Sequence, residues 1–262
     1  MSWKILRFLP RKSLSNWVGW WARRESPGFV VKAVIRWFAK TYKINLNEAE
    51  HELHQYRSLD AFFTRRLKPG VRSVAETFCV HPADSRITQF GIIENRTLIQ
   101  AKGLTYPLGE FLGSEDRAAK YDGGLFVVYY LCPTDYHRVH SPVEGTVKEI
   151  KRLGLDLWPV HDESVASFPN LFIVNERAVV SLNTQLGPVE VVFVGATNVG
   201  SIEIMKKEGE LVQKGEELGV FHMGSTVVMI YPKSMKLDPK ALQPHAVKWG
   251  GGLSVTKNPW ER

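Results

Sequence analysis

Cysteine, long apolar runs and metal-ligand spacings are scarce in this sequence. Cys79 and Cys132 are the only cysteines among 262 residues, too few for a disulfide framework and without the spacing of a zinc site. We expect both to be buried thiols in a reducing compartment. No run of about 18 apolar residues occurs, which predicts that no segment spans a bilayer. The basic N-terminus lacks the apolar core and cleavage site of a secretory signal.

Acidic residues are nearly absent from residues 1–43. Glu25 is the only acid there against ten basic residues, so this segment accounts for more than the whole net charge of +7. The same segment holds five of the eight tryptophans, which are Trp3, Trp17, Trp20, Trp21 and Trp37. Basic charge and indole rings are therefore concentrated together, and no nucleic-acid-binding motif accompanies them.

Apolar residues in this segment recur at helical spacing. Leu14, Trp17, Val18 and Trp21 fall on one face of a helix, and "SPG" at 26–28 ends it. A second such set follows, formed by Val30, Ala33, Val34, Trp37 and Phe38. Two basic, Trp-rich amphipathic helices suit an anionic membrane surface. The alternative is a helical hairpin packed on the main domain, and the pattern alone does not separate the two.

Short β-rich runs dominate the rest of the chain. A helix is expected over 56–72, ending before Pro69–Gly70. Gly, Pro, Asn and Asp then separate the predicted strands, which cover 96–101, 125–131, 145–153, 171–184, 188–196, 201–205, 217–221 and 225–231. The prediction is an α+β fold, mainly antiparallel β with a barrel-sandwich-like core and N-terminal amphipathic helices.

Three stretches place polar residues in unusual settings. Asp84 follows a proline turn in "HPADSRI", and His137 and His140 lie in "DYHRVHSP" directly after an apolar strand. Ser225 follows Gly224 inside the strand-like run "FHMGSTVVMI". Glycine is disfavoured inside strands, so Gly224–Ser225 indicates either a bulge or a peptide bond that itself reacts.

Several kinds of chemistry fit these residues. Asp84, His140 and Ser225 could form the triad of a serine hydrolase, although the G-x-S-x-G elbow is absent. The two histidines could bind a metal ion, but no third ligand has a telling spacing, so we expect no metal. Hairpins at 141–147 and 208–221 are typical of lipoyl-type carriers, in which Lys206 would be the modified residue; this likeness indicates architecture only.

The chain resembles the pyruvoyl-dependent phosphatidylserine decarboxylases, most closely their bacterial membrane-associated type. The resemblance extends over nearly the whole sequence through "YRSLDAFFTRRLKPGVR", "HPADSRI", "PTDYHRVHSPVEG", "VGATNVGSIE" and "KGEELGVFHMGSTVV". The family usually has Leu-Gly-Ser-Thr at the last site, whereas this chain has Met223 in the first place, a change that conserves volume.

The resemblance implies a self-cleaving proenzyme. Ser225 would attack the carbonyl group of Gly224, with His140, held by Asp84, as the base. Elimination would then leave a pyruvoyl group, derived from Ser225, whose ketone forms a Schiff base with the amine of phosphatidylserine. His137 would polarise or protonate the bound substrate with a pKa near 6.5. The expected products are phosphatidylethanolamine and carbon dioxide.

The resemblance also implies partners and a location. The two cleaved chains, 1–224 and 225–262, would stay together as a heterodimer, and further dimerisation is left open. Residues 1–62 would form a basic helical membrane-association region, and residues 63–262 the β-rich catalytic domain. The substrate is an anionic membrane lipid, so the enzyme is expected on the cytoplasmic side of the cell membrane as a peripheral protein that binds no nucleic acid.

Overall fold

The computed structural model describes residues 11–101, 104–160, 162–168, 170–196, 201–222, 225–235, 237 and 242–253. Its α-helices are α2 (Arg11–Ala22), α3 (Gly28–Thr41), α4 (Leu59–Phe63), α5 (Leu108–Leu112), α6 (Glu115–Ala118), α7 (Asp162–Val165) and α8 (Leu171–Val174). Single 3₁₀ turns are η1 (Leu46–Glu48), η2 (Leu53–Gln55), η3 (Ala119–Tyr121) and η4 (Lys233–Met235).

The strands begin at residue 79. They are β1 (Cys79–Val80), β2 (Ser85–Ile92), β3 (Thr97–Ala101), β4 (Leu104–Pro107), β5 (Leu125–Leu131), β6 (Arg138–His140), β7 (Gly145–Leu153), β8 (Arg177–Thr184), β9 (Gly187–Gly195), β10 (Ile202–Ile204), β11 (Leu211–Val212), β12 (Glu217–Phe221), β13 (Ser225–Tyr231), β14 (Ala246–Val247) and β15 (Gly252–Leu253).

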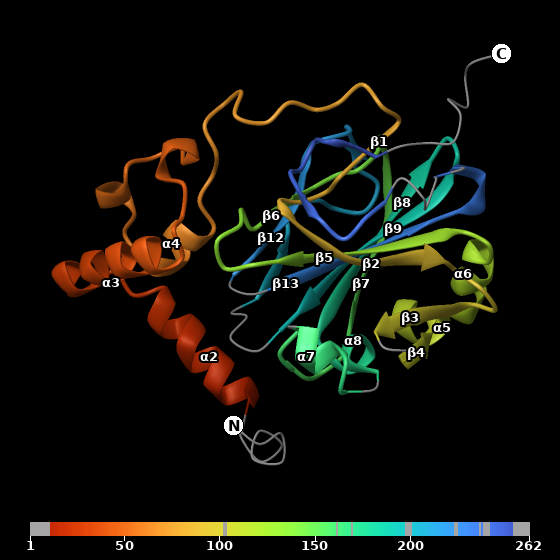
Figure 1. Cartoon of the computed structure of the whole chain (residues 1–262), viewed down its shortest axis with the longest axis horizontal. Helices are drawn as coiled ribbons and strands as arrows, with labels where there is room; N and C mark the ends of the chain where they lie inside the picture. Colours follow the sequence, from red (N-terminus) through yellow and green to blue (C-terminus); the bar gives the residue numbers. More distant parts are fainter. Residues whose placement is uncertain are drawn as a thin grey trace.

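An eight-stranded antiparallel sheet crosses the centre of the molecule (Figure 1). Its order is β11-β7-β8-β9-β13-β5-β2-β14, so β13 lies in the middle, paired with β9 and β5 along its length. A smaller sheet has the order β10-β12-β6, and the pairs β3–β4 and β1–β15 complete the strands. Within the described ranges the large sheet has β11 and β14 as its edges and does not close into a barrel.

Apolar residues alternate along β13 because successive strand side chains point to opposite faces. Val227 and Met229 join a core shared with β6, β10 and β12, whereas Val228 and Ile230 join a core under β3, β4, α5, α6 and α8. The large sheet is thus packed on both faces. The predicted α+β, mainly antiparallel fold with a sandwich-like core is confirmed.

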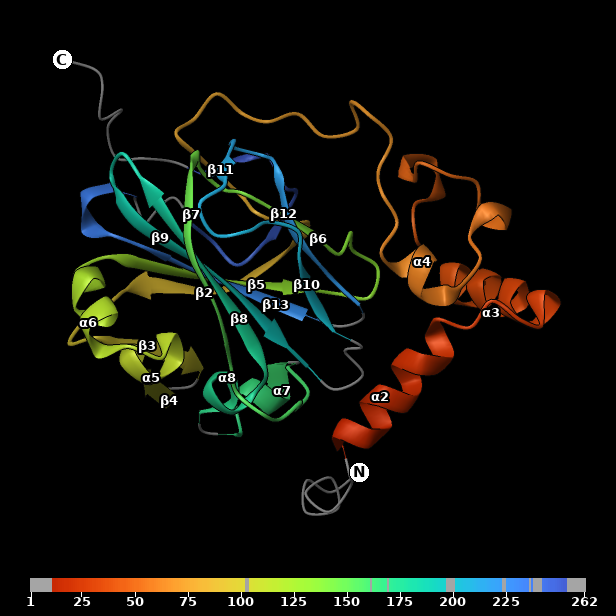
Figure 2. The same ribbon diagram turned by 180° about the vertical axis from the view of Figure 1, so that it is seen from behind.

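The N-terminal helices lie to one side of the strands in both views, joined to β1 by the long connection 64–78 (Figures 1 and 2). Both predicted helices are present as α2 and α3. They pack with α4 around a separate small core that includes Ile35, Phe38, Phe62 and Phe63. Trp17 and Trp37 were predicted on the apolar faces of the two helices. Instead, Trp17 is 60% exposed and Trp37 is 62% exposed. Residues 1–10 of the predicted membrane region lie outside the described residues.

Two predicted elements differ from the structure. The helix expected over 56–72 is only α4, because the chain beyond it turns to bond with 48–50 through Lys68 N to Glu48 O and Glu50 N to Arg66 O. The strand expected over 171–184 starts only at Arg177, since residues 171–174 form the helical turn α8. The domain boundary predicted after residue 62 falls inside α4.

The described helices lack the combination of length and hydropathy that crossing a bilayer requires. Cys79 is buried as expected, and desolvation raises the pKa of its thiol to about 12. Cys132 is half-buried rather than buried.

Candidate active site

Asp84 lies immediately before β2 and is 2% exposed. Its carboxylate accepts hydrogen bonds from Arg72 Nη2 (2.6 Å), Lys248 Nζ (3.0 Å) and the backbone N–H of Trp249 (3.0 Å). Arg72 also donates to Glu48 at 2.7 Å. A buried carboxylate is tolerated only when it is paired and hydrogen-bonded. These partners therefore supply the ion pairs and hydrogen bonds that the buried carboxylate of Asp84 requires.

His140 ends β6, and its ring is held on three sides. Nδ1 lies 2.8 Å from the carbonyl oxygen of Gly215, which can only accept, so Nδ1 carries the proton. Nε2 then accepts from the hydroxyl of Tyr136 at 3.2 Å. The Trp249 indole stacks on the imidazole with centroids 3.8 Å apart and planes 4° apart. Burial lowers the pKa of His140, which leaves Nε2 as the basic atom of a neutral ring.

Trp249 brings Asp84 and His140 into one cluster, through its backbone on one side and its indole on the other. Among the described residues no hydrogen bond joins Asp84 directly to His140, which differs from the expectation that Asp84 holds the imidazole. The reason is that two cations and one backbone N–H already occupy the carboxylate, while Gly215 orients the ring.

His137 lies between β5 and β6 and is fully buried. Its Nε2 donates to the carbonyl oxygen of Cys132 at 3.0 Å, and its ring stacks on Phe63 of α4 with centroids 3.9 Å apart. Burial, and after it the positive charge of Arg65, lowers the pKa of His137 to about 3. The pKa near 6.5 expected from the sequence therefore does not apply to this structure, in which the imidazole is neutral.

Ser225 begins β13, and its backbone pairs with Leu131 of β5 and Gly195 of β9. Met223, Gly224 and the side chain of Ser225 lie outside the described residues. Backbone connections nevertheless place His137 near this strand end: Cys132 follows Leu131, and the N–H of Phe221 donates to the carbonyl oxygen of His137 at 3.0 Å. His140 lies further along β6, opposite Glu217.

His222, on the other side of the predicted cleavage site, forms ion pairs. Its Nδ1 is 2.9 Å from Asp60 of α4 and its Nε2 3.2 Å from Glu203 of β10. The hydrogen bond to Asp60 is the main cause of a raised pKa for His222. The helical region and the strands are thus linked beside residue 223.

Two further chemistries, a carrier lysine and a metal site, were not favoured by the sequence. Lys206, the residue that a carrier would modify, is half-buried and ion-paired with Glu216. In the described part of the chain, no group of three His, Cys, Asp or Glu side chains could hold a metal ion.

Sequence reasoning missed Arg72, Tyr136 and Trp249, which hold Asp84 and His140 in place. Arg72 and Tyr136 lie inside the quoted stretches "YRSLDAFFTRRLKPGVR" and "PTDYHRVHSPVEG", so their position was a signal. Trp249 carried no such signal, since it lies more than 20 residues beyond "GSTVV".

Comparison with known proteins defines the class of this site. A family model described as phosphatidylserine decarboxylase matches residues 59–253, which include Asp84, both histidines and Ser225. The chain is therefore a decarboxylase.

Curated relatives named phosphatidylserine decarboxylase proenzyme agree over most of the chain. The protein of Myxococcus xanthus is 38% identical over 96% of this chain and 97% of its own length. That of an Anaeromyxobacter species is 40% identical, covering 95% of each chain, and that of Vibrio cholerae is 39% identical over 86% and 88%. The chain belongs to the phosphatidylserine decarboxylase family.

Proposed function

We propose that this protein decarboxylates phosphatidylserine to phosphatidylethanolamine after cutting its own chain between Gly224 and Ser225. The observation that carries the proposal is the family match over 59–253, which spans every candidate site residue. The word proenzyme in the relatives' names supports a precursor that is processed.

The cut begins with attack of Ser225 Oγ on the carbonyl carbon of Gly224, and the peptide bond becomes an ester. His140 Nε2 accepts the hydroxyl proton, exchanging its hydrogen bond with Tyr136 for one with Ser225. Loss of the Cα proton of Ser225 then expels the carboxylate of Gly224 and leaves a dehydroalanine. Addition of water with loss of ammonia gives the pyruvoyl group at position 225.

Backbone pairing with Leu131 and Gly195 would hold a pyruvoyl group at the start of β13. Such a group would supply an electron sink for decarboxylation. We assign His137 to holding and polarising the substrate as a neutral imidazole.

Strand pairing explains how the two pieces would remain together. The piece beginning at Ser225 includes β13, β14 and β15, which pair with β5 and β9, with β2, and with β1 respectively. Residues on both faces of β13 are buried. We therefore propose a heterodimer of chains 1–224 and 225–262.

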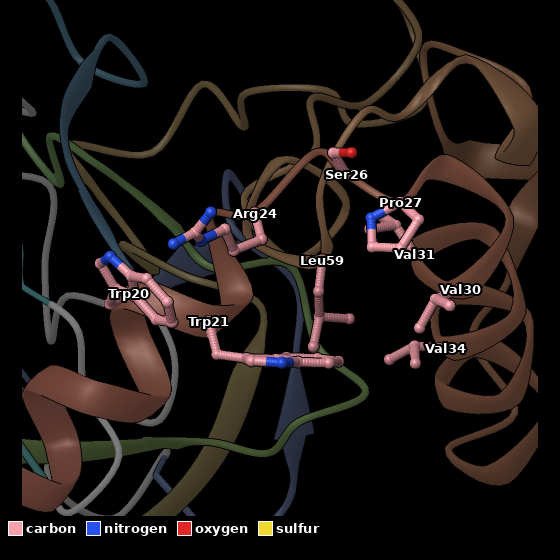
Figure 3. Close-up of a pocket in the computed structure, with 9 residues that line it drawn as sticks. All are labelled: Trp20, Trp21, Arg24, Ser26, Pro27, Val30, Val31, Val34 and Leu59. Atoms are coloured by element: carbon pink, nitrogen blue, oxygen red, sulfur yellow. The ribbon is translucent and has the colours of Figure 1, made fainter.

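The N-terminal helices are proposed to hold the enzyme at an anionic membrane surface, on the cytoplasmic side of the cell membrane. Trp17, Phe29 and Trp37 are each at least 60% exposed, and Arg24 stacks on Trp20 at 3.8 Å. A pocket of about 180 Å³ lies between α2 and α3. Figure 3 shows the ring of Trp21 beneath Leu59 in this pocket. Exposed indoles beside basic groups suit the headgroup region of a bilayer.

Replacement of Trp17, Phe29 and Trp37 by serine tests this assignment. We expect sedimentation with phosphatidylserine-containing vesicles to weaken about tenfold or more, because the side chains that enter the lipid are removed. Leu155→Ser is the matched control, since Leu155 is 81% exposed but lies among the strands. Unchanged vesicle binding by the triple variant would exclude a membrane role for these side chains.

The pH dependence of self-cleavage tests the role of His140. The base must be neutral to accept a proton, and burial lowers the pKa of His140. The rate should therefore be constant from neutral pH upward, with its acid limb below about 6.5. The measurement is the rate of cleavage of freshly translated chain across a pH series. An acid limb centred above that value would contradict the assignment.

The decisive experiment on the proposed function combines two measurements on the purified protein. Denaturing electrophoresis with intact mass should give two chains, the smaller with a blocked N-terminus, and phosphatidylserine vesicles should release carbon dioxide. One continuous chain whose Ser225 reacts with a phosphonate would instead support the serine hydrolase alternative with Asp84 and His140.

A further inference from the structure

Arg65, two residues beyond α4, is a buried cation with unused donors. It is 5% exposed, and its Nη2 donates to the backbone carbonyl oxygens of Thr134 (3.2 Å) and Asp135 (3.3 Å). Its Nε and Nη1 are buried as well, and neither has a hydrogen-bond partner within the described residues. Buried N–H groups without acceptors are rare in proteins because each loses its bonds to water.

The positive charge of Arg65 also lacks a direct counter-ion. Among the described residues no carboxylate oxygen lies within 4.0 Å of its guanidinium. Asp135 forms no ion pair with it: its backbone carbonyl accepts from Arg65, its carboxylate accepts from the N–H of Cys132, and the charge of that carboxylate acts on Arg65 only from beyond 4.0 Å. The ring of Phe62, 5.5 Å from Cζ, is an aromatic neighbour. Asp84, Asp135 and Glu48 attract Arg65 only at longer range, and burial still lowers the pKa of its guanidinium. A buried charge without a close partner is unfavourable, so an anion that reached Nε and Nη1 would stabilise this site.

Two other arginines whose side chains are largely buried lack these features. Arg177 is 3% exposed, but all three of its nitrogens donate to backbone carbonyl oxygens, including those of Phe111 and Glu110. Arg72 is paired with Asp84 and Glu48. Arg65 is therefore distinct from the arginines whose hydrogen bonds and charge serve the fold alone.

The location of Arg65 points to the substrate. The loop that it binds follows β5, whose last residue pairs with Ser225, and the same loop leads to His137. Phe63, two residues before Arg65, stacks on His137. Arg65 thus lies on the side of His137 from which the N-terminal helices approach.

Phosphatidylserine carries two anionic groups that a guanidinium could bind, the carboxylate and the phosphodiester. A cation on the carboxylate would stabilise the ground state and lose that interaction as carbon dioxide leaves, which would slow the reaction. A cation on the phosphodiester keeps its contact throughout. The guanidinium fork also matches two phosphate oxygens.

We propose that Arg65 binds the phosphodiester of the substrate headgroup through its Nε and Nη1. This inference rests on the proposed function. The Arg65 guanidinium is buried in this structure, so the surrounding side chains must move apart when the phosphate group enters. The bound phosphate then balances the positive charge of Arg65.

The test compares Arg65→Met with Arg66→Met, an exposed neighbour whose side chain lies at the surface. The substrates are a soluble short-chain phosphatidylserine and an O-alkylserine, which has the same amine and carboxylate but no phosphate. Arg65→Met should be cut into two chains and lose about 100-fold in kcat/KM for the phospholipid. Arg65 also lowers the pKa of His137, so the assays are run at a pH well above that pKa, where the imidazole is neutral in every variant. There kcat/KM of Arg65→Met for the O-alkylserine should stay at the wild-type value, as should both values for Arg66→Met.

A second substitution and a binding measurement test the same role of Arg65. Arg65→Lys keeps the charge without the fork and should recover about a tenth of the lost activity or more, a test that holds if Arg65→Met does not fold. Glycerophosphoethanolamine should raise the melting temperature of wild-type protein and not that of Arg65→Met or Arg65→Lys to the same extent. This binding test stands even if the wild type releases no carbon dioxide, the result that would sink the proposed function itself.

Equal loss on both substrates would overturn the proposal and assign Arg65 to holding the Thr134–Asp135 loop. Equal stabilisation of wild type and Arg65→Met by glycerophosphoethanolamine would overturn it independently. Unchanged phospholipid kinetics in Arg65→Met would do the same.

Discussion

Ser225→Ala is expected to yield one uncut chain of 262 residues with decarboxylase activity reduced about 10⁴-fold or more. Alanine has no Oγ to attack the carbonyl carbon of Gly224, so neither the ester nor the pyruvoyl group can form. Fold should be retained, because residue 225 would still pair through its backbone with Leu131 and Gly195. Intact mass and carbon dioxide release from phosphatidylserine are the two measurements.

Ser234→Ala is the matched control for this variant. Ser234 lies in the same C-terminal piece, but it is exposed and bonds to Leu186 O in a turn far from the strand end at residue 225. The control should be cut and active. A Ser225→Ala chain that still divides into two pieces would rule out residue 225 as the nucleophile.

His137→Ala is expected to separate processing from turnover. This variant should be cut normally but decarboxylate about 10²- to 10⁴-fold more slowly, because it lacks the group assigned to the substrate. His140→Ala, by contrast, should accumulate as uncut precursor. Gel analysis gives the cut fraction, and steady-state kinetics on the cut fraction gives kcat.

The control is His81→Gln, which alters another buried imidazole. His81 bonds to Tyr129 at 3.0 Å, and burial lowers the pKa of His81 to about 4, so desolvation resembles that at His137. This variant should be cut and active. Failure of His137→Ala to be cut would mean that the two histidines do not divide the reactions as proposed.

The strands were the most predictable part of the fold. Residues 125–131, 145–153, 217–221 and 225–231 form strands at the boundaries predicted, because apolar side chains there meet two cores and turn residues end each run. The helix over 56–72 was not predictable in this way. The apolar residues of this stretch do indicate a helix, but the helix ends at Phe63. Beyond it, residues 66–68 form backbone hydrogen bonds with residues 48–50 instead.

The sequence allowed the main residues of the candidate site to be identified, but not the side chains that they contact. Asp84, His137 and His140 were identifiable within recognisable stretches, whereas the partners of Asp84 come from positions 72, 248 and 249. No spacing rule links residues so far apart in the chain. The unused donors of Arg65 were equally hidden, because a sequence does not reveal which arginines find carbonyl partners.

The pairing of β14 with β2 and of β15 with β1 has a consequence for the history of the molecule. Before the proposed cut these contacts close loops within one polypeptide, at a modest entropic cost. Afterwards they join two separate chains. Refolding after denaturation then requires the two chains to associate, and it becomes less efficient as the protein is diluted. Each copy would then assemble efficiently once, during its own synthesis, and its lifetime would depend on how slowly the central strand is released.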